Sequence, residues 1–189
     1  MNDMSTKIVA ETTGRGARFT TAEFERMCKL GTFDDMTVEL VDGGLERLNK
    51  PMDMHASRQA MIVGMLWAAL GVERQGLIRA EIGIDMGGDT VLACDAALLR
   101  APLSENRWPR PDELLLVIEV SETTLGRDLG MKVPRYAAAG ISNCWVVDGT
   151  ASVIHSYGGL VNGTYGDVAV VRFGEPLSIP GTDATITLT

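Results

Sequence analysis

The stretch Leu114-Leu115-Leu116-Val117-Ile118-Glu119-Val120-Ser121 is the segment from which the fold is best inferred. Seven of its eight residues suit a buried β-strand, and the exception is the carboxylate of Glu119 near the strand's end. An ionised carboxylate in a dry sheet is costly unless it is paired with a cation or bound to a metal. Glu119 could also simply emerge at the edge of the sheet, so the neighbouring segments decide between a structural and a functional role.

The chain has 189 residues, of which 46% are hydrophobic and 22% charged, a composition typical of one ordinary globular domain with a sizeable core. We expect residues 1–17 to form a flexible N-terminal tail and residues 18–189 to form a single domain. The three cysteines, Cys28, Cys94 and Cys144, show no CxxC spacing and predict core residues in a reducing compartment.

Two features bear on location and partners. No N-terminal signal is visible in residues 1–13, and the longest apolar run, residues 60–72, is shorter than the ~20 residues that cross a bilayer. We therefore expect a cytoplasmic protein without a membrane partner. The net charge of −8 argues against a broad basic face that coats nucleic acid, but it permits an enzyme whose bound cations offset local carboxylates.

The sequence predicts a mixed α/β (α+β) fold, with a central mixed sheet flanked by helices. Thr20 to Glu23 has capping-box spacing and opens a short helix, and Asp42-Gly43-Gly44 indicates a hairpin turn. The expected elements are a helix ending near 31, strands 37–41 and 45–48, a loop 51–55, a helix 56–70, strands 76–85, 90–99 and 114–121, a helix from about 128 to 139, a strand 144–148, and short antiparallel strands beyond 153.

The helix at 56–70 is apolar nearly all round, because Ile62, Val63 and Trp67 flank the face formed by Met61 and Met65. Such a pattern predicts burial on more than one side. Together with the long apolar strands, it makes a homodimer plausible.

Carboxylates on two predicted strands could form a metal site. If the strands that carry Asp95 and Glu119 are neighbours, their side chains can meet at the sheet's edge, where burial and mutual repulsion make both ionised forms costly. A divalent cation removes that cost, and hard oxygen ligands suit Mg²⁺ or Mn²⁺.

The helix that follows carries three polar residues on one face. Lys132 lies one turn after Asp128 and one turn before Tyr136, provided that Pro134 does not break the helix. Beside a metal-bound carboxylate pair, an ammonium can orient a water or stabilise a phosphorane-like charge. The alternatives are a solvated ion pair of Asp128 with Lys132 and a core role for Tyr136.

Two further residues have open interpretations. Glu39 could be the solvent-facing member of its hairpin, and His55, immediately before the predicted helix, could be a capping or packing residue.

Several of these segments together resemble a known family. The segments are Glu39-Leu40-Val41-Asp42-Gly43, His55, Asp95, Val117 to Ser121, Asp128 to Lys132, Tyr136 to Ile141 and Trp145 to Asp148. Over about residues 18–172 they resemble the Uma-two family, bacterial proteins assigned as endonucleases within the restriction-endonuclease-like PD-(D/E)XK superfamily.

The resemblance implies a Mg²⁺-dependent (or Mn²⁺-dependent) endonuclease that acts on DNA. Carried over residue by residue, Asp95 and Glu119 match the metal-binding acidic residues, and Lys132 matches a lysine moved from the strand to the following helix. In our hypothesis for the metal site, the Val120 carbonyl is a further ligand. Glu39 matches an acidic residue of the N-terminal part and His55 a recurrent histidine, whereas Asp128 and Tyr136 match positions flanking the lysine.

The chain departs from the superfamily pattern in two places. The strand lysine would fall at position 121, which is Ser121, and the family's Pro-Asp pair is replaced by Cys94-Asp95. A literal Pro-Asp pair occurs at Pro111-Asp112, but its aspartate is only seven residues before Glu119, at the start of the same strand. A side chain there cannot lie alongside Glu119 as one from an adjacent strand can, so we do not assign it to the metal site.

Two alternatives to the nuclease stay open. The first is a catalytically degenerate nuclease fold that binds protein or nucleic acid, which the net charge and Ser121 favour. The second is a metal-dependent hydrolase of a small phosphoester, which fits the charge but lacks a substrate-pocket signature.

Overall fold

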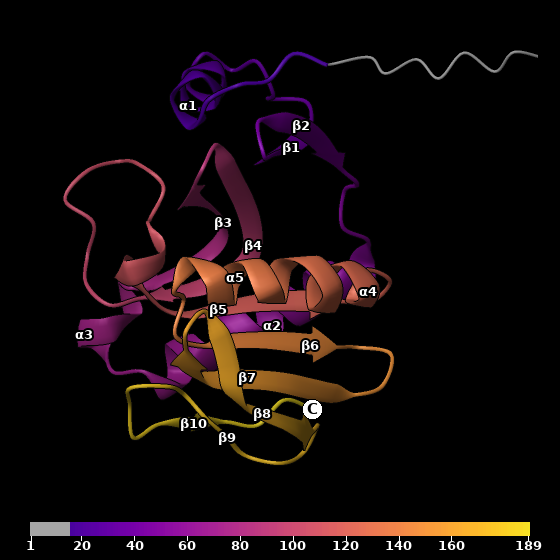
Figure 1. Ribbon diagram of the computed structural model, residues 1–189. Helices are drawn as coiled ribbons and strands as arrows, with labels where there is room; N and C mark the ends of the chain where they lie inside the picture. The colour runs from indigo at the N-terminus through magenta and orange to yellow at the C-terminus, as the bar shows by residue number, and fades with distance from the viewer. Residues whose placement is uncertain (1–15) are drawn as a thin grey trace, which may run out of the picture.

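The computed structural model describes residues 16–189; most of the predicted tail, residues 1–15, lies outside the described part. A large mixed sheet of eight strands separates two layers of helices, as the sequence predicts. The short helices α4 and α5 cover one face, and the long helix α2 lies against the other (Figure 1).

The helices and strands follow one another along the chain. Their bounds are α1 Thr21–Lys29, β1 Thr37–Val41, β2 Gly44–Leu48, α2 Asp53–Ala69, α3 Val72–Gln75, β3 Ile78–Gly87, β4 Thr90–Leu99, η1 Pro111–Glu113, β5 Leu114–Ser121, α4 Leu125–Arg127, η2 Asp128–Lys132, α5 Val133–Ala139, β6 Cys144–Asp148, β7 Val153–Val161, β8 Thr164–Arg172, β9 Leu177–Ser178 and β10 Thr185–Ile186.

The strands are ordered β2-β1-β4-β5-β6-β7-β8, and β3 pairs with β4 outside this path. Among the strands of residues 16–189, only β5 and β6 run parallel, which the intervening helical segment α4–η2–α5 makes possible. β4 and β5 are antiparallel, and their ladder extends to the pair Ala96 and Ile118. The strands predicted to carry Asp95 and Glu119 are therefore neighbours.

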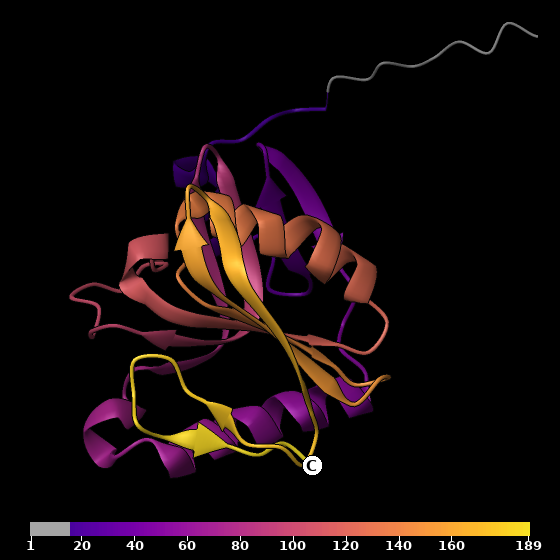
Figure 2. The ribbon, with the colours of Figure 1, turned by 60° about the horizontal axis from the view of Figure 1, so that its bottom comes forward.

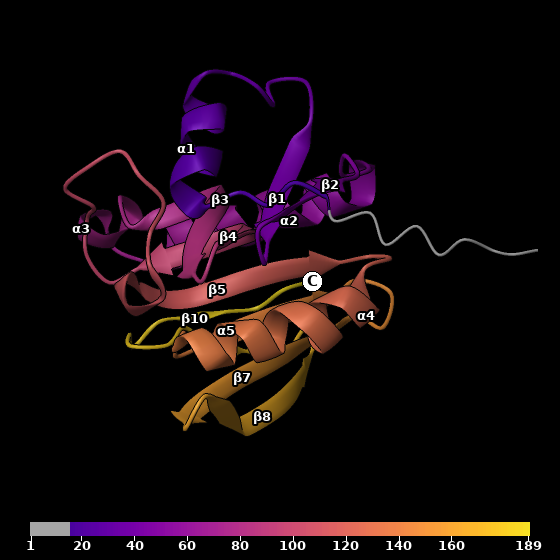
Figure 3. The ribbon, with the colours of Figure 1, turned by 45° about the horizontal axis from the view of Figure 1, so that its top comes forward.

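Two layers of apolar side chains pack against the two faces of the sheet. Residues such as Ile118 and Val120 face α2 and the small sheet of β9 and β10, whereas Val117 faces α5 in the layer that contains Tyr136. Figure 2 shows α5 above the sheet and α2 with β9 and β10 below it. A third cluster packs α1 through Phe24 against β1 and β4, and Figure 3 shows α1 near β1 and β3.

Two expectations for α2 are wrong. The helix begins at Asp53, so His55 lies in its first turn and not in a preceding loop. The helix is buried on one side only: its buried residues are Gln59, Ile62 and Leu66, whereas Met61 and Trp67 are exposed. The sheet can cover only one face of a helix that lies flat against it.

The predicted helix 128–139 is longer and less regular than expected. It starts at Leu125, passes through a π turn at Asp128–Lys132, and continues as α5 from Val133. Pro134 stands in the first turn of α5, where its missing N–H is tolerated best. The proline thus changes the hydrogen-bond pattern without breaking the segment.

Candidate active site

Glu119 is buried on the face of the sheet that α5 covers. The residue is only 2% exposed. Oε2 accepts a hydrogen bond from Lys132 Nζ at 3.0 Å, and Oε1 accepts one from the Tyr136 hydroxyl. The carboxylate is therefore paired with a cation and a neutral donor, and it does not emerge at the sheet's edge.

Lys132 reaches the sheet from the last position of the π turn. Its ammonium donates to the carbonyl oxygen of Ala93 at 2.7 Å and lies 3.5 Å from Glu39 Oε1, in addition to its contact with Glu119. A π turn widens the helix and rotates the following side chains, which is why such turns recur at functional sites. The structure brings Lys132 to the β4–β5 pair while position 121 holds a buried serine.

Asp95 stands one residue beyond the end of the β4–β5 ladder. Its Oδ2 accepts the backbone N–H of Val120 at 2.6 Å, and its Oδ1 lies 3.0 Å from His55 Nε2. Gln59 donates to the Asp95 carbonyl oxygen at 2.8 Å. Asp95 is thus held from the α2 side, whereas Glu119 is held from the α5 side, and Val120 links the two.

Glu39 is buried at 1% exposure, so a solvent-facing role in the hairpin is wrong. Its Oε1 accepts the backbone N–H of Ala93 at 2.9 Å, and its Oε2 accepts from Arg127 at 2.6 Å. Arg127 also donates to Glu46 at 3.0 Å. Sequence reasoning missed Arg127, because nothing in its own segment indicates a partner 88 residues earlier in the chain.

Asp128 does not form the solvated ion pair with Lys132 that helical spacing allows. Its side chain is buried and accepts hydrogen bonds from the hydroxyls of Ser121 and, at 2.8 Å, Thr124. The π turn places Lys132 toward Glu119 and Glu39 instead. Asp128 therefore fixes the start of the turn to the end of β5.

The surroundings of Glu119 favour its neutral form. Burial raises the pKa of Glu119 to about 8. The negative charges of Asp95 and Asp128 act in the same direction, while the Lys132 ammonium and the Tyr136 hydroxyl act against it. A cation added beside this carboxylate would lower the pKa by the same physical effect as Lys132.

The surroundings of Lys132 favour its charged form. Burial lowers its pKa, but the carboxylates of Glu119 and Glu39 raise it by more, so the net shift is upward. A lysine that holds its proton cannot act as a general base. It can orient a water or stabilise developing negative charge. His55 is also shifted toward its charged form, because its hydrogen bond with Asp95 raises its pKa.

Asp95 and Glu119 carry carboxylates on adjacent strands, but Asp95 is held from the α2 side of the sheet and Glu119 from the α5 side. Their carboxylate oxygens and the backbone carbonyl of Val120 are of the ligand types that Mg²⁺ and Mn²⁺ prefer. Within residues 16–189, no three or more His, Cys, Asp or Glu side chains gather as a metal cluster. Mg²⁺ is usually bound through one or two carboxylates and retains several waters, so a cation here would need only these two side chains and the Val120 carbonyl from the protein.

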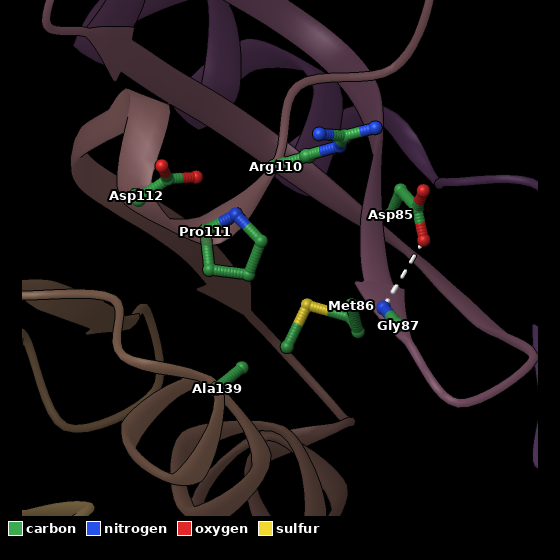
Figure 4. Close-up of a pocket in the computed structure, with 7 residues that line it drawn as sticks. All are labelled: Asp85, Met86, Gly87, Arg110, Pro111, Asp112 and Ala139. Atoms are coloured by element: carbon green, nitrogen blue, oxygen red, sulfur yellow. Dashed lines mark hydrogen bonds between the residues drawn. The ribbon is translucent and has the colours of Figure 1, made fainter.

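The literal Pro111-Asp112 pair lies elsewhere. Both residues line an open hollow of about 340 Å³ together with Asp85, Met86 and Arg110, and Figure 4 shows Asp112 directed into this region. Asp112 belongs to the turn before β5 and takes no part in the network around Glu119.

No helix in the described part of the chain has the length and apolar character to span a membrane.

Comparisons with known proteins agree with the fold and identify the family. Residues 21–189 match the family model Uma2, described as "Putative restriction endonuclease". A crystal structure described as "a putative nuclease belonging to DUF820", from Anabaena variabilis ATCC 29413, superposes with a TM-score of 0.60 at 18% identity, covering 86% of this chain and 89% of that one. No curated protein matches. The family model spans nearly the whole described chain, and the chain therefore belongs to the Uma2 family.

Proposed function

We propose that this protein is a Mg²⁺-dependent (or Mn²⁺-dependent) endonuclease that hydrolyses phosphodiester bonds in DNA. The observation that carries the proposal is the convergence of Lys132 and Glu119 at 3.0 Å, next to the strand that bears Asp95. The family description and the description of the Anabaena variabilis protein support a nuclease.

Asp95 and Glu119 would hold the cation, with the Val120 carbonyl as a third protein ligand. When bound, Mg²⁺ supplies a Lewis acid and lowers the pKa of a coordinated water. The hydrogen bond that Asp95 accepts from Val120 N–H and the contact with His55 fix the orientation of the first carboxylate. Tyr136 and Lys132 fix that of the second.

Lys132 would orient the attacking water and stabilise the charge that develops on the phosphoryl oxygens. Its raised pKa supports an electrostatic role and argues against proton abstraction by this residue. Glu39 lies 3.5 Å from the same ammonium, and Arg127 binds its other oxygen. Glu39 would therefore position Lys132, or assist a second cation or a water, while Asp128 anchors the turn.

A degenerate nuclease fold that binds protein or nucleic acid is the second candidate. The net charge of −8 and the serine at position 121 favour it. Burying the three ionisable side chains of Glu119, Lys132 and Glu39 costs free energy, and a catalytic role is a reason to retain them, which favours the enzyme.

The test is an incubation of the full chain with plasmid DNA, with RNA of similar length and with bis(4-nitrophenyl) phosphate, each with Mg²⁺, Mn²⁺ or chelator. We expect cation-dependent cleavage of DNA. Cleavage of the small diester alone would support a small-phosphoester hydrolase. No cleavage under any condition, or cleavage that chelator leaves unchanged, would overturn the proposal.

A further inference from the structure

The outer face of α2 concentrates the exposed apolar residues of the chain. Half of the ten large hydrophobic residues exposed in the described part lie on α2 or directly beside its ends; these are Met52, Met54, Met61, Trp67 and Val72. Between Arg58 and the end of the helix at Ala69 there is no charged residue. An outward helix face on a monomer normally carries charges, so this face lacks the groups that would keep it in water.

A row of small residues runs along the same face. Ala56, Ala60, Gly64 and Ala68 follow one another at intervals of four, and all are exposed. A Cβ added at Gly64 would meet no atom within 4 Å. Small side chains in one row let a second helix approach closely, since interaxial distances depend on the residues at the contact.

The face is symmetric about Ile62. Ala60 and Gly64 stand two residues to either side, Ala56 and Ala68 stand six to either side, and the exposed Met52 and Val72 stand ten to either side. A two-fold interface requires one patch that is complementary to itself. Two antiparallel copies of α2 would therefore bring small residues against small ones along most of the helix.

Charged residues stand only at the two ends of this face. Exposed Lys50 and Asp53 stand at the start of α2, and exposed Glu73 and Arg74 stand just after its end. Because each copy carries a net charge of −8, an uncharged face is also where two copies repel one another least.

We propose that the outer face of α2 is a homodimer interface in which two copies of this helix pack antiparallel around Ile62. The inner face of the same helix presents His55 and Gln59 to Asp95. The interface therefore stabilises the helix that orients the first acidic residue of the candidate site. This inference does not depend on nuclease activity.

The test is the molar mass of the full chain in solution, measured by light scattering at micromolar concentration. We expect a dimer for the wild type, a monomer for Ala60→Glu and a dimer for the control Val168→Glu. The control places the same charge on a different exposed apolar residue, on β8. A monomeric wild type, or a dimeric Ala60→Glu variant with a normal circular dichroism spectrum, would overturn the proposal.

Trp67 provides a second measurement that does not depend on the folding of Ala60→Glu. Trp67 is 49% exposed in a single copy, and dimerisation would bury its side chain. The Trp67 contribution, obtained by difference from Trp67→Phe, should shift to longer wavelength when the wild type is diluted. Emission independent of concentration over the range in which the molar mass is followed would contradict the interface.

Discussion

Lys132 Nζ lies 3.0 Å from Glu119 Oε2, although the strand β5 and the π turn that supply them are separated by a loop and a helical turn. Both groups are buried, and Lys132 also contacts Ala93 and Glu39. The ammonium beside Glu119 is therefore supplied by the π turn, whereas position 121 on the strand is a serine that bonds to Asp128.

Replacement of Lys132 by methionine should remove DNA cleavage and destabilise the fold. Cleavage should fall roughly 100-fold or more, because the group that orients the water and stabilises charge is lost. The free energy of unfolding should fall by about 3–5 kcal/mol, since Glu119 and Glu39 lose a buried cation. Urea denaturation and a cleavage time course measure both effects. Lys50→Met, at an exposed position, should change neither.

Replacement of Tyr136 by phenylalanine should raise the pH at which cleavage begins. The tyrosine hydroxyl donates to Glu119 and opposes the rise in its pKa, so its loss makes the ionised carboxylate harder to form. The free energy of unfolding should fall by about 1–3 kcal/mol. The pH profile of cleavage is the measurement, with Tyr157→Phe on β7 as the matched control. An unchanged profile would contradict a link between this hydroxyl and Glu119.

In the presence of chelator, the stability of the fold should fall as pH rises from about 4.5 to about 8. The pKa of Glu119 is raised from 4.5 to about 8 on folding, so the folded chain binds this proton more tightly than the unfolded chain. The stabilisation is complete below pH 4.5 and is lost through pH 8, and its size is a few kcal/mol. Glu119→Gln should remove this part of the pH dependence.

The same titration repeated with Mg²⁺ or Mn²⁺ separates the metal-free from the metal-bound chain. A cation that binds Glu119 should stabilise the protein most near pH 8, where the carboxylate is ionised, and least near pH 4.5. Equal stabilisation of the wild type and Glu119→Gln by the cation would contradict Glu119 as a ligand.

The fold was predictable because its strongest signals are local. The alternation and length of apolar runs predicted β4, β5 and β6 with their observed bounds, and Asp42-Gly43 predicted the β1–β2 hairpin. The start of α2 was misplaced, since Met52 makes no side-chain cap and Asp53 to His55 carry no distinctive helical pattern. Whether α2 is buried on one side or on two depends on how many layers of the fold cover it. The periodicity of apolar residues in the sequence carries no information about those layers.

The site was predictable in part. An acidic residue within an apolar strand is costly unless something pairs with it, which indicated Asp95 and Glu119 before any partner was known. Which face each side chain occupies depends on where the β4–β5 ladder ends, and Asp95 lies beyond its last pair. Arg127 was not predictable, because its partners Glu39 and Glu46 are 88 and 81 residues away along the chain.

The most direct test compares Asp95→Ala with Asp112→Ala in DNA cleavage with Mg²⁺ or Mn²⁺. Asp112 is the exposed aspartate of the literal Pro-Asp pair, so its variant is a matched control that leaves the candidate site intact. We expect Asp112→Ala to cleave at the wild-type rate and Asp95→Ala to cleave roughly 100-fold more slowly or not at all. Equal cleavage by Asp95→Ala and the wild type would contradict a metal site built on Asp95 and Glu119.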